Sequence, residues 1–462
     1  MIDSPGACHK MRSKLRQLIF GGEARRALAI AESLTASFDQ GLNVELVKAE
    51  IYAQGGIELG RADLIETSVQ IWLAVLENHW SPNVTYNVAK AQLELWRLAV
   101  KSVGMASAWL AKRKHLHEAR RLYEQVARDE NAPTELRMTA LTALANSYDI
   151  VGRYLDAIDC YGRALKIDPS FGIARGHRAI ALLDASMLIG AHKGDLVRQA
   201  AADLVAAVED KERVLEYGGQ EALDVFEARR DTITIQTVNA QGPTTYRRAL
   251  GEPYLDWCLN KRLFLHNWHD CIHSETELLD PVLCKNISFT EKDIELEDVN
   301  ELLDAFNAIK RDYTFARYEL WLAVAPESPI AQQVREINRR SSYLDTWTYA
   351  NWNLRTGFAI GAMKAAVDVL DKIAVFLHLY LGSNLGQNLY FHNLPYKDKS
   401  REKLSPALSK ALQHPEQNKS LLALFDLSSE VRDQSDTFLG RQVKYRTCRN
   451  SSLLRGSHGG SR

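Results

Sequence analysis

The residues best suited to chemistry lie near the C-terminus, where cationic side chains recur at short intervals. They are Arg441, Lys444, Arg446, Arg449 and Arg455. Guanidinium and ammonium groups gathered on one helix face attract phosphate, so this set is a candidate RNA-binding surface. The alternative is a solvated charged face, which is common on terminal helices, and Tyr445 is the one aromatic side chain interleaved with the set for base stacking.

A second group of candidate ligands is the histidine-rich run HNWHDCIH, residues 266–273. The atoms that zinc prefers come from His266, His269, Cys271 and His273, with Cys258 and Cys284 on either side. Ligands at two-residue steps with one lone cysteine on each side match no closed structural zinc site, and a site needs geometry as well as atoms. We therefore interpret the run as surface or loop residues and expect no metal and no cofactor.

The element around which the chain is organised is MTALTALANSYDIVGRYLDAIDCYGRALKIDPS, residues 138–170. Two runs of apolar residues at three- and four-residue steps predict one face on each of two helices: Leu141, Leu144, Ala145 and Tyr148, then Ala157, Tyr161 and Ala164. A turn at Gly152-Arg153 separates the helices, and Pro169 ends the second. The stretch resembles a tetratricopeptide repeat, a helix-turn-helix unit of 34 residues.

Weaker units of the same kind precede and follow this one. They are Gly21–Leu34, a unit from Tyr52 through Trp72 to Pro82, the pair Thr85–Trp96 and His117–Ala127, and Asp195–Val208. Stacked helical units bury one another's apolar faces, and at least about three are needed for a stable array. We therefore expect an array whose concave face binds an unidentified protein or peptide.

Bulk composition limits the function classes. The 462 residues favour two or three domains, and 46% hydrophobic with 25% charged residues is typical of a soluble globular protein. A net charge of −1 gives no overall attraction to nucleic acid or anionic membrane, so RNA contact would require a local basic surface.

Targeting features are also missing from the pattern. The N-terminal MIDSPGACHKMRSKLRQ has no apolar core and is not a secretory signal. The most apolar helix, Gly357–Gly382, carries four charges, and its uncharged run Ile373–Leu381 is too short to span a bilayer. The six cysteines are scattered singly, as in reduced cytosolic proteins. We expect a cytoplasmic protein without membrane contact.

A change of composition marks the end of the repeats. The β-branched alternation TITIQTV, Thr232–Val238, and the Gly242-Pro243 pair favour a boundary rather than another helix. We therefore expect a helical repeat domain over 1–240 (best unit 138–171), a connecting segment over 241–295, a helical bundle over 296–455 and a disordered tail over 456–462.

Four helical segments predict the bundle: Val299–Val324, Thr356–Gly382, a third within Leu404–Val431, and Ser435–Leu454. We interpret the pairs Asp371-Lys372 and Asp312/Arg317 as salt bridges between bundle helices rather than site residues, and Trp321, Trp347 and Trp352 as core. The predicted fold class is all-α, a tetratricopeptide-like array of helical hairpins followed by a four-helix bundle.

Residues in the second half carry a more specific resemblance. The segments WCLNKRLFLH, AIKRDYTFARYEL and DKIAVFLHLYL, with Arg449-Asn450, resemble the HEPN domain (higher-eukaryote and prokaryote nucleotide-binding), in the branch that follows tetratricopeptide-like repeats. The resemblance covers about 254–450. It implies a four-helix bundle that often forms homodimers and, in many members, a metal-independent ribonuclease of a defence or stress system.

The ribonuclease signature of that family is an arginine, a polar residue, and a histidine four to six residues further on. Histidine can deprotonate the RNA 2′-hydroxyl, and the guanidinium can hold the phosphate. Arg449-Asn450 matches the opening, but Leu454, Arg455 and Gly456 stand where the histidine belongs, and His458 follows Arg449 by nine residues.

Because the histidine is missing at positions 454–456, the resemblance is compatible with two functions. The first is an adaptor with a degenerate nuclease motif, in which the repeats bind a partner and the bundle dimerises or holds RNA or a nucleotide. The alternative is an active metal-independent endoribonuclease that uses Arg449, Asn450 and a displaced His458.

Overall fold

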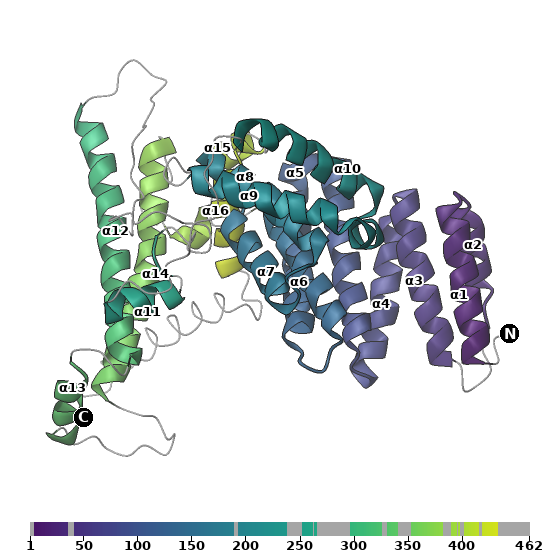
Figure 1. Ribbon diagram of the computed structural model, residues 1–462, viewed down its shortest axis with the longest axis horizontal. Helices are drawn as coiled ribbons and strands as arrows, with labels where there is room; N and C mark the ends of the chain where they lie inside the picture. The colour runs from purple at the N-terminus through teal and green to yellow at the C-terminus, as the bar shows by residue number, and fades with distance from the viewer. Residues whose placement is uncertain are drawn as a thin grey trace, which may run out of the picture. The chain divides into compact units, whose positions relative to one another are not determined.

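The computed structural model describes most of the first half of the chain and separate stretches of the second. The described residues are 4–35, 41–188, 193–237, 252–261, 263–265, 296–325, 330–340, 353–381, 390–394, 396–397, 402–414 and 418–432. Within these stretches the fold is all-α, as predicted from the sequence (Figure 1). The described residues form no β-strand, and Tyr396 and Leu404 make one isolated antiparallel bridge.

Ten helices occupy the described part of residues 1–240. They are α1 (Pro5–Phe20), α2 (Ala24–Glu32), α3 (Gly41–Leu59), α4 (Ala62–Asn78), α5 (Pro82–Arg128), α6 (Thr134–Asp149), α7 (Tyr154–Ile167), α8 (Gly172–Leu188), α9 (Lys193–Glu209) and α10 (Lys211–Thr237). The later described helices are α11 (Pro253–Lys261), α12 (Leu296–Val324), α13 (Ala331–Arg340), α14 (Leu354–Leu381), the short 3₁₀ helix η2 (Phe391–Asn393), α15 (Pro406–Ala411) and α16 (Lys419–Arg432). None of these helices is long and apolar enough to cross a membrane, among the residues described.

The described residues fall into two compact units. The first unit draws on the described residues within 1–182, 200–232 and 408–432, and the second on those within 183–199 and 233–407. In the first unit each helix from α1 to α7 packs against its neighbours in sequence, and α1 also packs against α3. In the second unit the main contact is between the long helices α12 and α14.

The helical hairpins of the first unit reverse at glycines. Gly22, Gly60 and Gly152 stand between α1 and α2, α3 and α4, and α6 and α7, and each has a φ between +65° and +80°. Glycine adopts this left-handed conformation without the steric cost that a Cβ would add. The predicted turn at Gly152-Arg153 is therefore confirmed, and the same turn recurs in hairpins where the sequence pattern is weaker.

Helix α5 is itself a hairpin, because its backbone leaves the helical region at Gly104 (φ 77°, ψ 164°). Residues before this glycine meet residues after it. The rings of Tyr86 and Tyr123 lie 5.5 Å apart, and His115 Nδ1 lies 2.5 Å from Gln92 Oε1. Trp96 and Trp109 also meet, edge to face at 6.1 Å, and both are fully buried. The expected partnership between Thr85–Trp96 and His117–Ala127 is confirmed.

The central unit has the predicted packing. Ala157, Tyr161 and Ala164 on α7 are fully buried, and the Tyr161 hydroxyl donates a hydrogen bond to Asn146 Oδ1 on α6. Small residues on either side of a tyrosine let the two helices approach closely, because the ring fills the space between them. Whether these hairpins are tetratricopeptide repeats stays a prediction.

One local prediction is wrong. The alternation that begins at Thr232 is helical, and α10 continues to Thr237. Ile233 is buried, with 4% of its surface exposed. β-propensity depends strongly on context, so β-branched residues can also form part of a helix. Residues 238 and 242–243 lie outside the described residues, and the domain boundaries stay predictions.

The helices expected in the second half are found wherever residues are described. The segments Val299–Val324 and Thr356–Gly382 correspond to α12 and α14. The third expected helix, within Leu404–Val431, corresponds to α15 and α16. The fourth, Ser435–Leu454, and the tail 456–462 lie outside the described residues.

A partly buried histidine is expected to make the first unit sensitive to acid. His177 on α8 lies between Tyr161, at a ring distance of 6.2 Å, and Phe226, at 5.2 Å, and burial lowers its pKa to about 4. The unfolded chain binds this proton below about pH 6.5, whereas the folded chain binds it only near pH 4. We therefore predict that the free energy of unfolding falls by at most roughly 3 kcal/mol between pH 6.5 and pH 4.

Urea unfolding across this pH range checks the prediction. His177→Gln should flatten the pH dependence, whereas replacement of the exposed His79 by Gln should leave it unchanged. Equal slopes for the wild-type chain and His177→Gln would show that His177 does not cause the acid sensitivity.

Candidate binding groove in the helical repeats

The sequence-predicted site residues lie outside the described residues. This applies to the arginine, lysine and asparagine set and to the displaced histidine: Arg441, Lys444, Arg446, Arg449, Asn450, Arg455 and His458. It applies also to the histidine-rich run 266–273 and to Cys284, whereas Cys258 is buried on α11. The described residues contain no group of three or more side chains placed to hold a metal ion.

The charged residues of α12 and α14 have structural partners. Lys372 forms an ion pair with Asp312 across the two helices, and Asp371 Oδ1 accepts a hydrogen bond of 3.0 Å from the Phe391 backbone N–H. An ion pair between the two helices is therefore present, but it joins Asp312 to Lys372, whereas the pairs expected from the sequence were Asp371-Lys372 and Asp312/Arg317. Phe306 and Phe376, with ring centroids 6.0 Å apart, pack beside it.

Arg317 connects α12 to the segment around α11. Its Nε donates to the Tyr254 hydroxyl at 2.9 Å, and its Nη1 donates to the Leu263 carbonyl at 3.0 Å. Burial raises the pKa of Tyr254 to about 12, although the Arg317 charge opposes the rise. Trp321 is buried as expected, whereas Trp347 and Trp352 lie outside the described residues. The Arg317 guanidinium therefore has a structural role, because it joins α12 to the segment around α11.

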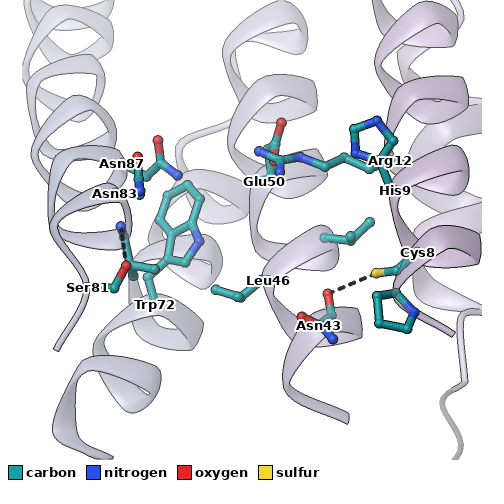
Figure 2. A pocket seen from close by; sticks show the side chains of 13 residues that line it. Cys8, His9, Arg12, Asn43, Leu46, Glu50, Trp72, Ser81, Asn83 and Asn87 are labelled. Atoms are coloured by element: carbon teal, nitrogen blue, oxygen red, sulfur yellow. Dashed lines mark hydrogen bonds and ion pairs between the residues drawn. The ribbon is translucent and has the colours of Figure 1, made fainter. Parts of the chain in front are cut away.

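A groove with polar walls lies between the first helices of successive hairpins (Figure 2). Its cavity volume is about 280 Å³. The lining residues come from α1, α3, α4 and the start of α5: Pro5, Cys8, His9, Arg12, Asn43, Leu46, Val47, Glu50, Trp72, Ser81, Asn83, Val84 and Asn87. Because α1, α3 and α5 each begin near this groove, three neighbouring helices supply its walls from their N-terminal halves.

Glu50 is the fixed charge of the groove. It is 6% exposed, and its Oε2 lies 2.5 Å from Arg12 Nε of α1, which points toward it in Figure 2. Arg16 of α1 forms a second ion pair with Glu50. Two cations therefore face one carboxylate, and this edge of the groove carries one surplus positive charge.

Cys8 is the groove's thiol. Its Sγ–H donates to the Asn43 carbonyl at 3.4 Å, and burial raises its pKa, with Arg12 acting in the opposite direction. A nucleophilic cysteine needs a lowered pKa, because the thiolate is the reactive form. Cys8 is therefore a packing residue that ties α1 to α3.

The opposite wall of the groove offers amide groups. Asn83 and Asn87 lie one helical turn apart at the start of α5, with the Trp72 ring beside them (Figure 2). Ser81 caps this helix by accepting a hydrogen bond of 3.4 Å from the Val84 N–H. A side-chain amide has both a donor and an acceptor, so it can pair with the N–H and C=O groups of an extended peptide.

Sequence reasoning did not find this groove. Asn83 and Asn87 lie one helical turn apart, but no sequence spacing relates them to Asn43, and the three line one groove only because α3 packs near α5. Once the helix boundaries are known, polar residues near the starts of α3 and α5 could have indicated the groove.

Residues 294–456 match the family model for LA2681-like HEPN. This stretch, hereafter the HEPN segment, contains the helices α12 to α16 and, in sequence, Arg449-Asn450. The resemblance drawn from the sequence is confirmed for the HEPN segment. A comparison with curated proteins finds no match.

The Glu50 ion pairs should contribute measurably to stability. We predict that Glu50→Gln lowers the free energy of unfolding by about 1–3 kcal/mol, because it leaves two guanidinium groups beside a neutral amide. The matched control is Glu66→Gln, which removes an exposed carboxylate paired with Lys112 across helices and should cost less than about 1 kcal/mol. Chemical denaturation measures both, and equal losses would contradict a special role for Glu50.

Proposed function

We propose that this chain is an adaptor in which helical repeats bind a protein or peptide while the HEPN segment holds RNA or a nucleotide. The supporting observation is the family match over 294–456 combined with the absence of histidine at positions 454–456. An arginine that holds phosphate can still bind RNA when no correctly spaced histidine is present, but the proton transfer that cleavage requires is lost. As in the family it resembles, the bundle forms a homodimer, and the chain acts in a defence or stress system.

The groove supports the partner-binding half of this proposal. Its lining combines apolar side chains, two amide side chains and a surplus cation, which suits an extended peptide better than a folded surface. Concave surfaces of stacked helical hairpins commonly serve as binding sites.

The alternative function is a metal-independent endoribonuclease, favoured by the Arg449-Asn450 pair that matches the opening of the signature. In that reaction a base removes the 2′-hydroxyl proton, the oxygen attacks the adjacent phosphate, and the 5′-oxygen leaves with a proton. His458 would have to act as the base, with Arg449 holding the phosphate.

Incubation of the full chain with a structured RNA in the presence of a chelator distinguishes the two functions. We expect that the full chain does not cleave the RNA. We also expect that it binds the RNA and that Arg449→Ala weakens this binding. Cleavage that leaves cyclic-phosphate ends and disappears in both Arg449→Ala and His458→Ala would establish the nuclease instead.

The role of the groove can be tested by measuring which proteins the immobilised chain retains. We predict that the double replacement of Asn83 and Asn87 by Ala reduces the set of proteins retained by the immobilised chain, because peptide backbone groups lose their pairing amides. Gln17→Ala, exposed on α1 and outside the groove lining, is the control. Identical retention by all three chains, measured by quantitative mass spectrometry, would place the partner elsewhere.

A further inference from the structure

Helix α16 of the HEPN segment is held by charges on the helical hairpins of the first unit. Its Asp426 is completely buried, and Asp426 Oδ2 accepts hydrogen bonds from Arg120 Nη1 at 2.6 Å and from Arg153 Nη1 at 3.1 Å. His117 Nε2 lies 3.4 Å from the other carboxylate oxygen. Burial alone would raise the pKa of Asp426, but the charges of Arg120 and Arg153 and the contact with His117 hold it well below its usual range.

A second carboxylate on α16 completes the contact. Glu430 lies one helical turn beyond Asp426 and forms an ion pair with Arg153, which also donates to Asp156 at 2.8 Å. Residues four apart lie on the same helix face, so both carboxylates point to one side of α16.

Contacts within the hairpins themselves orient both arginines. Arg120 donates to the Ser147 hydroxyl at 3.2 Å and to the Ser147 carbonyl at 2.8 Å. Both guanidinium groups lie on the ring of Tyr148, at 4.4 Å and 4.5 Å from its centroid. The hairpin residues therefore form a preorganised cationic seat on α5, α6 and the start of α7.

The start of α16 also fits this seat closely. A Cβ on Gly152 would lie 2.6 Å from the Lys419 carbonyl oxygen, closer than any side chain tolerates. The Lys419 ammonium lies 5.4 Å from the ring centroid of Tyr154. The Gly152 turn is thus required both for reversing the hairpin and for admitting α16.

We infer that the seat formed by Arg120, Tyr148 and Arg153 is a docking site for an amphipathic helix with carboxylates four residues apart, and that α16 occupies it as a clasp. Removing one member of a buried ion pair leaves an uncompensated charge, so a helix lacking either carboxylate is rejected. A helix of the same charge pattern on another protein competes with α16. In the sequence, Arg449 follows the end of α16 by 17 residues.

Amide hydrogen exchange of the full chain tests the clasp. Gly152→Ala should raise the exchange rate of residues 419–432 on the order of tenfold, while α1–α4 stay protected. Gly60→Ala is the matched control, because Gly60 has the same left-handed backbone (φ 65°) with open space around its Cβ position. Unchanged exchange of α16 in Gly152→Ala, or loss of protection throughout the first unit, would overturn the inference.

Peptide binding in trans tests the charge pattern. A synthetic peptide covering residues 418–432 should bind a full chain carrying Asp426→Lys, whose own α16 cannot take the seat, and should not bind the wild-type chain. The same peptide with Asp426→Asn and Glu430→Gln should bind neither. Equal binding of both peptides, or binding of neither to the Asp426→Lys chain with α1–α4 still protected, would overturn the proposal. If that chain does not fold, the exchange measurement on Gly152→Ala decides the question.

Discussion

The structure of the first unit depends on one constraint, the reversal of the chain at glycines with a left-handed backbone. Gly22, Gly60, Gly104 and Gly152 turn successive helices back on one another, so that apolar faces only a few turns long can be buried. Without these reversals, Trp96 and Trp109 would lie on one continuous helix and could not meet edge to face. The groove and the seat for α16 both follow from this stacking, since each is lined by more than one hairpin.

Buried charge has different consequences at Glu50 and at Asp426. Glu50 sits at the edge of the groove with half-exposed arginines, so solvent screens part of the interaction. Asp426 is enclosed by Arg120, Arg153 and His117, and breaking such a pair typically costs about 3–5 kcal/mol. The first arrangement favours ligand exchange at a surface, whereas the second favours recognition of one particular helix.

Much of the fold could be predicted from the sequence, because helix periodicity is a local signal. The turn at Gly152, the packing of Tyr161 and the partnership across Gly104 all come from residues near one another in the chain. The prediction for Thr232–Val238 was wrong because the chain stays helical to Thr237, with Ile233 buried, although β-branched residues favour strands in other contexts. The site residues were harder, since Asp426 and Arg120 are separated by 306 positions and neither follows a recognisable motif.

The contact of α16 with two separate hairpin positions has an evolutionary consequence. Arrays of identical repeats can gain or lose a unit by duplication or deletion, because every junction is equivalent. Here α16 draws its cationic partners from two particular positions, Arg120 before α6 and Arg153 after it. Excision of the intervening hairpin helix would separate the two guanidinium groups from their common carboxylate. The spacing between these two arginines is therefore constrained by Asp426, and this part of the array cannot lose or gain a helix without losing the contact.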